Sequence, residues 1–196
     1  MDILEIFAVA TTLACVWLTV RQNIWTWPLG LVAVTLYGIF FYQHKLYADM
    51  GLQAVYFAFN VYGWYEWLYG GEGHTRLKVS RVRPGVYAVL IVIGGAFAYV
   101  LGTTLAAKTD AAAPYFDSTL TAYSLVAQFM MTRKWIENWQ VWIAVDIAYV
   151  WLFISRGLNL TAGLYAVFIV LATMGLFEWR KSFGGDEVSA EQAEGC

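Results

Sequence analysis

An aspartate stands in the middle of an apolar, tryptophan-rich segment, residues 138–155. Asp146 follows Trp142 by four residues, so a helix would place both side chains on one face. A carboxylate beside aromatic rings suits an organic cation, because each ring adds roughly 0.5–2 kcal/mol of cation–π attraction and the carboxylate balances the charge. Asp146 and Trp142 are therefore the first candidates for a binding site. The alternative for Asp146 is a packing role, as a partner of a neighbouring hydroxyl or as a neutral acid.

Two further segments, 48–69 and 115–132, carry polar and aromatic residues at helical spacing. The candidate ligand contacts on their faces are Gln53, Tyr56, Asn60, Trp64, Thr121, Ser124 and Gln128. Asn60 offers donors and an acceptor for an amide or for sugar hydroxyls, and its alternative role is an interhelical hydrogen bond. A face as polar as that of 115–132 is expected to line a cavity if it lies in lipid. Asp117, near the start of that segment, is interpreted as a cap or loop anchor.

The composition predicts a chain that lies in the lipid bilayer. Of its 196 residues, 60% are hydrophobic, 18% aromatic and only 13% charged, and a soluble fold of this size could not bury so much apolar surface. No basic stripe is present, which argues against nucleic acid. The two cysteines, one in an apolar run and one at the last position, indicate no disulfide framework and no metal site. No cofactor is expected.

Seven apolar segments predict an all-α membrane protein with seven transmembrane helices. The expected spans are 3–20, 25–43, 48–69, 85–106, 115–132, 138–155 and 159–179. Pro28 either bends the second span or lies in its first turn. The first span begins with acidic rather than basic residues, so we expect it to be retained and not cleaved as a signal peptide. The polar tail, 182–196, is expected to be disordered in the cytoplasm.

Basic residues predict the orientation of the spans. Three of the twelve lysines and arginines lie in the loops after spans two, four and six, and nine lie on the other side. The positive-inside rule therefore places the N-terminus outside and the C-terminus in the cytoplasm of a multi-pass inner-membrane protein.

The sequence repeats itself after 112 residues. Residues 21–67 align with 133–179 without a gap, and 13 of the 47 positions are identical. We therefore expect a three-helix repeat in 1–69, a linker helix with its loops in 70–112 and a second three-helix repeat in 113–181. A single linker helix gives both triplets the same orientation, which predicts a 3+1+3 parallel pseudo-repeat with a central site between the halves.

The repeat separates architectural residues from ligand contacts. Residues kept in both halves are expected to be structural, whereas an asymmetric ligand should meet different residues in each half. Asp146 aligns with Val34, Trp142 with Gly30 and Asn60 with Ala172. The residues interpreted as structural are Trp27, Pro28, Gly51, Gly63, Trp139, Gly163 and Gly175, the glycines through close helix contact.

The sequence has no set of residues arranged for covalent catalysis. It lacks a nucleophile–base set, a metal-binding helix motif and a phosphate loop, so an enzyme is not expected. Asp146 is the only deep carboxylate, whereas a proton pump would carry a chain of them. A facilitator is therefore favoured over a coupled pump, and a membrane enzyme, a sensor or a partner-binding membrane protein is the rival class.

Two long motifs resemble the PnuC-type bacterial vitamin transporter family. They are "KLYADMGLQAVYFAFNVYGWYEW" (45–67) and "MTRKWIENWQVWIAVDIAYVWLF" (131–153), and the similarity covers nearly the whole chain. The resemblance implies facilitated uptake of nicotinamide riboside, intracellular trapping by a cytoplasmic kinase, an architecture related to SWEET-type sugar transporters, and homo-oligomers that are commonly trimers. It assigns substrate contacts to Asn60, Tyr56 and Trp64 in the first motif, and to Trp142, Asp146 and Asn138 in the second.

The chain departs from the family pattern at two positions. Riboside-carrying members often have asparagine where this chain has Asp146, and an apolar residue where it has Gln128. Nicotinamide riboside and thiamine both hold a fixed positive charge in an aromatic ring, so Asp146 and Trp142 suit either vitamin. The prediction is nicotinamide riboside, with thiamine or another cationic or aromatic vitamin as the alternative.

Overall fold

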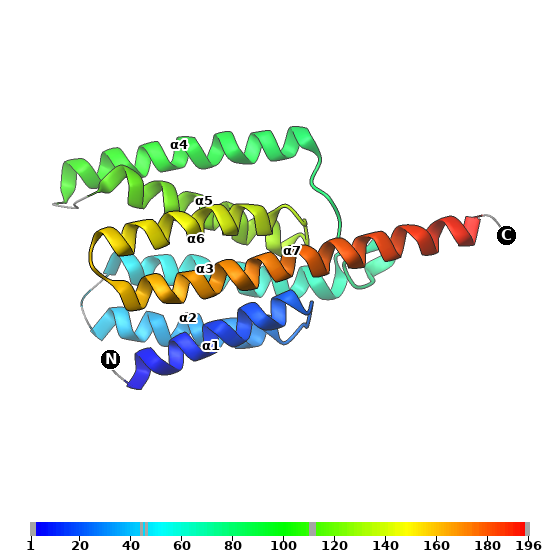
Figure 1. Ribbon diagram of the computed structural model, residues 1–196, viewed down its shortest axis with the longest axis horizontal. Helices are drawn as coiled ribbons and strands as arrows, with labels where there is room; N and C mark the ends of the chain where they lie inside the picture. Colours follow the sequence, from blue (N-terminus) through cyan, green and yellow to red (C-terminus); the bar gives the residue numbers. More distant parts are fainter. Residues whose placement is uncertain (1–2, 44, 46, 110–112, 195–196) are drawn as a thin grey trace. The chain divides into compact units, whose positions relative to one another are not determined.

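The computed structural model describes residues 3–43, 45, 47–109 and 113–194 (Figure 1). Apart from one isolated bridge between Ser80 and Trp135, regular secondary structure in these residues is helical. The elements are α1 (Ile3–Val20), α2 (Thr26–Gln43), α3 (Tyr47–Tyr69), the short η1 (Glu72–His74), α4 (Pro84–Lys108), α5 (Pro114–Thr132), α6 (Asn138–Ser155) and α7 (Asn159–Glu194). The predicted all-α class with seven helices is confirmed. The first six helices begin and end within two residues of the predicted spans.

Two of these helices are long and apolar enough to cross a membrane by length and composition. Within the described residues they are α4 and the stretch Asn159–Gly185 of α7, each with a mean hydropathy of 2.1. A shorter apolar stretch, Val9–Val20, lies in α1. The other predicted spans contain many tryptophan, tyrosine and amide side chains, which lower mean hydropathy although they pack well among apolar groups.

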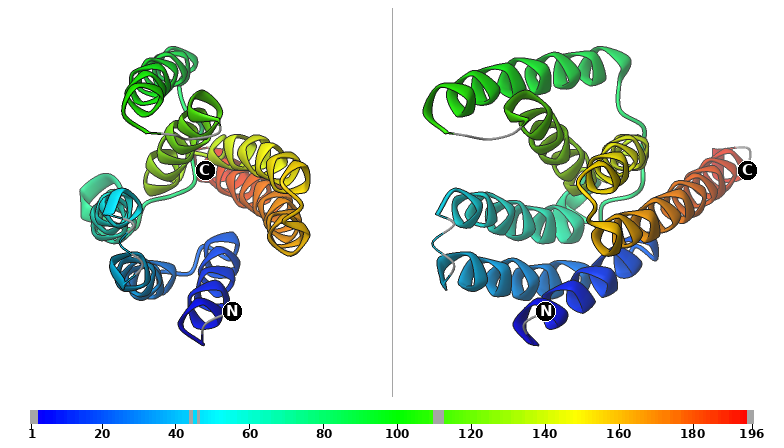
Figure 2. Two further views of the ribbon diagram at one scale, coloured as in Figure 1. Left: turned by 90° about the vertical axis from the view of Figure 1, so that its left-hand side faces the viewer. Right: turned by 60° about the vertical axis from the view of Figure 1, so that its left-hand side comes forward.

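The chain divides into two compact units. Unit 1 comprises Met1–Val79, Thr132–Lys134 and Phe177–Cys196, and unit 2 comprises Ser80–Met131 and Trp135–Leu176. In unit 1, α2 packs against both α1 and α3 (Figure 2). Three tryptophans, Trp27, Trp67 and Trp179, are almost fully buried there. Trp67 contacts both of the others edge-on, with ring centroids 5.2 Å and 5.9 Å away.

Unit 2 is built around α4, α5 and α6. Its core contains Leu120, Met130 and Val145, with aromatic rings from α4, α5 and α6 packed against it. Small residues of α4 are buried, and a Cβ on Gly94 would meet Tyr123 of α5 at 3.2 Å. The Tyr123 hydroxyl donates a hydrogen bond to the Ile91 carbonyl at 3.2 Å, which fixes α5 against α4.

The turns before α2 and α6 have the same backbone conformation, 112 residues apart. Gln22 and Lys134 are both left-handed, with φ of 52° and 50°. In the first turn Trp27 N–H donates to the Ile24 carbonyl at 3.2 Å, and in the second Trp139 N–H donates to the Ile136 carbonyl at 3.2 Å. The loops that follow these helices also match, since Lys45 and Gly157 have φ of 58° and 72°. Thus the aligned sequences adopt the same local structure.

Three expectations differ from the structure or are decided by it. Helix α7 continues to Glu194, through most of the tail that was expected to be disordered. Several alanine, glutamate and glutamine residues favour helix in this stretch. Residues 195–196 lie outside the described part of the chain. Gly51 and Gly163 make no close helix contact, since a Cβ at either would meet no described atom within 4 Å. Pro28 is the third residue of α2 and so lies in the first turn of that helix.

Candidate binding site

Asp146 lies in the middle of α6 and is 5% exposed. Among the described residues it has no hydrogen-bonding or ion-pair partner. An ionised carboxylate without a partner is costly in the interior of a membrane protein, and such residues usually mark a substrate or ion pathway. Asp146 is therefore a candidate counter-ion for a mobile positive charge.

Trp142 precedes Asp146 by one helical turn and packs against the core of unit 2. Its indole N–H is buried and has no hydrogen-bond partner in the described part of the chain. A buried donor of this kind normally finds a partner in a folded protein. Trp142 thus places an aromatic ring, and an indole N–H without a described partner, one helical turn from the carboxylate of Asp146.

Trp139 and Asn138, in the first turn of α6, are part of the packing. Trp139 is almost fully buried, and its indole ring occupies the space beside Gly175 of α7. Asn138 is fully buried, and its amide nitrogen donates to the Trp135 carbonyl at 2.6 Å. The structural prediction for Trp139 agrees with this position, whereas Asn138 has a local structural bond in addition to its predicted ligand contact.

Tyr149 of α6 lies against the polar face of α5, near Asp146. The side chains of Tyr149 and the buried Ser124 lie close together, and Asp146 is also near Tyr149. Gln128 and Thr121 are half-buried on α5. Repetition in both halves predicts a packing role for Tyr149, which aligns with Tyr37, whereas its spacing of three residues from Asp146 places it on the same face of the helix.

Asp117 at the start of α5 forms an ion pair with Arg156 in the loop after α6, at 3.7 Å. This contact agrees with the expected role of Asp117 as a loop anchor. The pair joins the start of α5 to the loop after α6, and its contribution to stability is small because both side chains are more than a third exposed.

The candidates of the first triplet lie in unit 1, on α3. Asn60 is buried, donates to the Tyr56 carbonyl at 2.8 Å and covers Gly30 of α2, where any Cβ would overlap its side-chain oxygen. This arrangement gives Asn60 a helix-packing role. Trp64, in contrast, is partly exposed.

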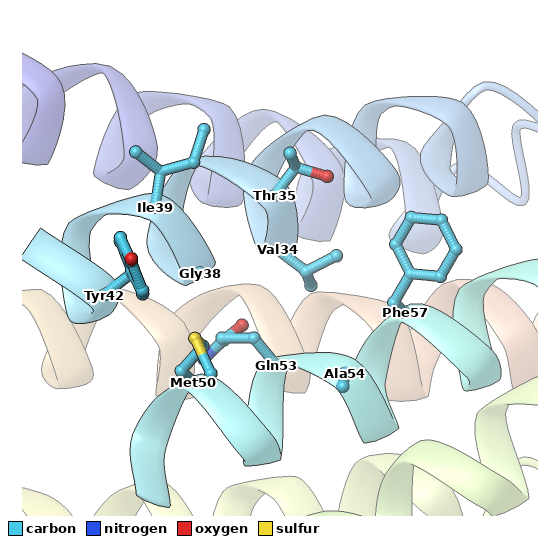
Figure 3. A pocket seen from close by; sticks show the side chains of 9 residues that line it. All are labelled: Val34, Thr35, Gly38, Ile39, Tyr42, Met50, Gln53, Ala54 and Phe57. Carbon is cyan, nitrogen blue, oxygen red and sulfur yellow. The ribbon is translucent and has the colours of Figure 1, made fainter. Parts of the chain in front are cut away.

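Gln53 lines a groove between α2 and α3 (Figure 3). The groove has a volume of about 470 Å³, and its other lining residues include Val34, Gly38, Met50 and Phe57. The positions aligned with Val34 and Gln53 in the second triplet are Asp146 and Tyr165. There, Tyr165 packs its ring 4.6 Å from that of Tyr149. On unit 1 the aligned positions are thus an apolar residue and an amide that line an open groove, whereas on unit 2 they are a buried carboxylate and a packed aromatic ring.

Comparison with known proteins assigns the chain to a family. Residues 2–181 match the family model of the nicotinamide mononucleotide transporters. The chain belongs to this family. It is 31% identical over 209 residues to the nicotinamide riboside transporter PnuC of Escherichia coli K12, covering 92% of this chain and 87% of that protein. The predicted resemblance is therefore confirmed, and the chain is a membrane transporter.

Two further relatives bear on the fold and on the range of ligands. The riboflavin/roseoflavin transporter RibM of Streptomyces davaonensis is 30% identical over 166 residues, covering 81% of this chain and 76% of RibM. The crystal structure of the vitamin B3 transporter PnuC superimposes with a TM-score of 0.70 at 25% identity, covering 91% of this chain and 80% of that one. The relatives of this chain are thus named for different vitamins.

Proposed function

We propose that this transporter takes up nicotinamide riboside across the bacterial inner membrane by facilitated diffusion. The observation that carries the proposal is the buried carboxylate of Asp146 one helical turn from the indole of Trp142, whose N–H has no hydrogen-bond partner among the described residues. Nicotinamide riboside has a pyridinium ring with a fixed positive charge. Its charge would satisfy Asp146, and its ring would gain cation–π attraction from Trp142.

The polar groups of the substrate need partners as well. Gln128, Ser124 and Thr121 of α5 are proposed to contact the carboxamide or the ribose hydroxyls, since amide and hydroxyl side chains can donate and accept. The remaining proposed contacts are Asn60, Tyr56, Trp64 and Gln53 on α3, and Asn138 on α6. Asn60 would contact substrate only in addition to its packing against Gly30.

The transport cycle is proposed to follow from a 3+1+3 parallel pseudo-repeat, in which the two triplets rock to give alternating access. The matching turns at Gln22 and Lys134 and the matching loops at Lys45 and Gly157 support such a repeat. We place seven helices across the membrane with the N-terminus outside, as the distribution of basic residues indicates. Phosphorylation by a cytoplasmic kinase would trap the substrate, and homo-oligomers, such as trimers, are expected.

Thiamine is the second candidate cargo, because it is also a cationic aromatic vitamin. The relation to RibM makes riboflavin a third. Riboflavin is uncharged, so Asp146 would have no charge to balance. A thermal-shift screen of the three vitamins against the wild type and Asp146→Asn discriminates among them: a cationic cargo stabilises the wild type more than the variant, and riboflavin stabilises both alike.

Purified protein in liposomes tests the function itself. The wild type should accumulate labelled nicotinamide riboside to equilibrium without an added partner, ion gradient or energy source. Uptake that requires a proton or sodium gradient would contradict facilitated diffusion, and the absence of any uptake of the three vitamins would contradict the proposal as a whole.

A further inference from the structure

Unit 1 contains an ion pair between two distant parts of the chain. Arg133, directly after α5, donates to the carboxylate of Glu66 near the end of α3, and to the Tyr62 hydroxyl at 3.2 Å. The ammonium group of the adjacent Lys134 lies 4.4 Å from the ring centroid of Trp67. We call Glu66, Arg133 and Tyr62 the latch. It ties the end of a first-triplet helix to the end of a second-triplet helix.

A second ion pair is formed by the residues that align with Arg133 and Glu66 in the internal repeat. Arg21 aligns with Arg133, and Glu178 aligns with Glu66. Arg21 pairs with Glu178 at 3.6 Å, so each arginine binds the glutamate of the other triplet. The exchange of partners means that both ion pairs must break if the triplets separate at this end.

The two ion pairs differ in burial. The side chains of Arg21 and Glu178 are 60% and 48% exposed, whereas those of Arg133 and Glu66 are 37% and 9% exposed. Exposed pairs are screened by water and salt and contribute little. A largely buried carboxylate is costly to leave without its partner. The repeat therefore supplies one strong and one weak version of the same contact.

Arg133 keeps its charge under all ordinary conditions. Partial burial by itself would lower the pKa of its guanidinium, but the hydrogen bond with Tyr62 and the charge of Glu66 outweigh that effect and raise the pKa above its usual value. The latch therefore opens by separation of the two groups and not by loss of the proton from Arg133.

We propose that the Glu66–Arg133 latch holds the cytoplasmic side of the transporter closed and must open for substrate release, whereas the related Arg21–Glu178 pair has little influence on that step. The proposal rests on the proposed transport function. It follows from the connection that the latch makes between the triplets and from the unequal burial of the two pairs. Neither glutamate belongs to the proposed substrate contacts, so their effects concern the conformational equilibrium and not binding.

The experiment measures opening directly, without substrate. Thr132 is fully buried next to Arg133. Thr132→Cys in a background of Cys15→Ser and Cys196→Ser provides a thiol whose labelling by a polar maleimide reports exposure of this end. Labelling rates are measured in detergent for Glu66→Gln and Arg133→Gln, with Glu178→Gln and Arg21→Gln as the matched controls.

We expect either latch variant to speed labelling by about tenfold, which corresponds to ~1.4 kcal/mol in the closed–open equilibrium. Arg133→Gln provides a second test if Glu66→Gln does not fold. The control variants should stay within about twofold of the parent, as expected for an exposed pair. Equal rates in latch and control variants, or unchanged rates in all four, would overturn the proposal.

The same variants in liposomes separate this proposal from the proposed function. Breaking the latch lowers the population of the outward-facing form, so the external substrate concentration for half-maximal uptake should rise in the latch variants and not in the controls. If the parent carries no nicotinamide riboside, the proposed function is wrong while the labelling result still tests the latch. If the parent carries it and labelling does not change, only the latch is wrong.

Discussion

The indole of Trp139 occupies the space beside Gly175, and the indole of Trp27 occupies the space beside Gly63 in the same way. Both pairs join the second helix of a triplet to the third. Gly175 has no side chain, so the large ring can lie directly against its backbone. This contact fixes the first turn of α6, from which Trp142 and Asp146 follow at one-turn intervals.

Replacing Gly175 with alanine should destabilise the protein. The new Cβ would lie 2.5 Å from ring atoms of Trp139, so the fully packed ring would have to move, at a cost of about 1–3 kcal/mol. Gly163→Ala on the same helix is the control, because no described atom lies near its Cβ and alanine favours helix by up to about 1 kcal/mol. Thermal unfolding in detergent should show a lower Tm for Gly175→Ala only. Equal Tm values for the two variants would contradict the packing role.

Trp142→Leu should weaken substrate binding without unfolding the protein. Loss of one ring removes about 0.5–2 kcal/mol of cation–π attraction, which raises the concentration for half-maximal uptake by about 2- to 30-fold. The Trp142→Phe variant keeps an aromatic ring, so its substrate concentration for half-maximal uptake should lie between those of the wild type and Trp142→Leu. The control is Trp151→Leu on the same helix, since Trp151 is exposed and lies away from the face of Asp146. An equal effect of the two leucine variants would remove Trp142 from the site.

Glu137→Ala should loosen the segment before α4. The Glu137 carboxylate accepts a hydrogen bond from the Val82 N–H at 3.0 Å, and Ile136 N–H donates to the Ser80 carbonyl at 3.0 Å. A hydrogen bond to a charged group contributes about 1.5–3 kcal/mol, so local opening should become at least about tenfold more frequent.

Limited digestion with trypsin measures this opening, because the segment offers Lys78 and Arg81 as cleavage sites, whereas the bond after Arg83 precedes Pro84 and resists trypsin. Cleavage there should accelerate in Glu137→Ala. Glu72→Ala provides the control, since Glu72 lies in the same loop and its side chain is exposed. Unaltered cleavage in Glu137→Ala would show that the hydrogen bond does not hold the segment.

Much of the fold follows from local signals in the sequence. The positions of the first six helices follow from the lengths of the apolar segments and from prolines at the starts of α4 and α5, which suit a first turn. The end of α7 does not follow, because two glycines disfavour helix there whereas the alanine, glutamate and glutamine residues after them favour it, so the local signals oppose each other. The open space beside Gly51 and Gly163 also cannot be predicted from the sequence, because it depends on where the neighbouring helices lie.

The candidate site could be predicted in part. Asp146 and Trp142 stand out because a carboxylate is rare in an apolar helix and because neither residue is kept in the other triplet. The packing of Asn60 over Gly30 could not be predicted, since it depends on the crossing of α2 and α3. The connection from Asp146 through Tyr149 to Ser124 also requires the contact between α5 and α6. A rule based on repetition alone assigns Tyr149 to packing and so misses this connection.

The central claim is that Asp146 balances the positive charge of the substrate. It is tested most directly by uptake into liposomes of nicotinamide riboside and of its dihydro form, which has a similar shape and an uncharged ring. We predict that the wild type prefers the cation and that Asp146→Asn lowers this preference by about tenfold or more, or ~1.4 kcal/mol. An unchanged preference in Asp146→Asn, or equal uptake of both forms by the wild type, would contradict the account.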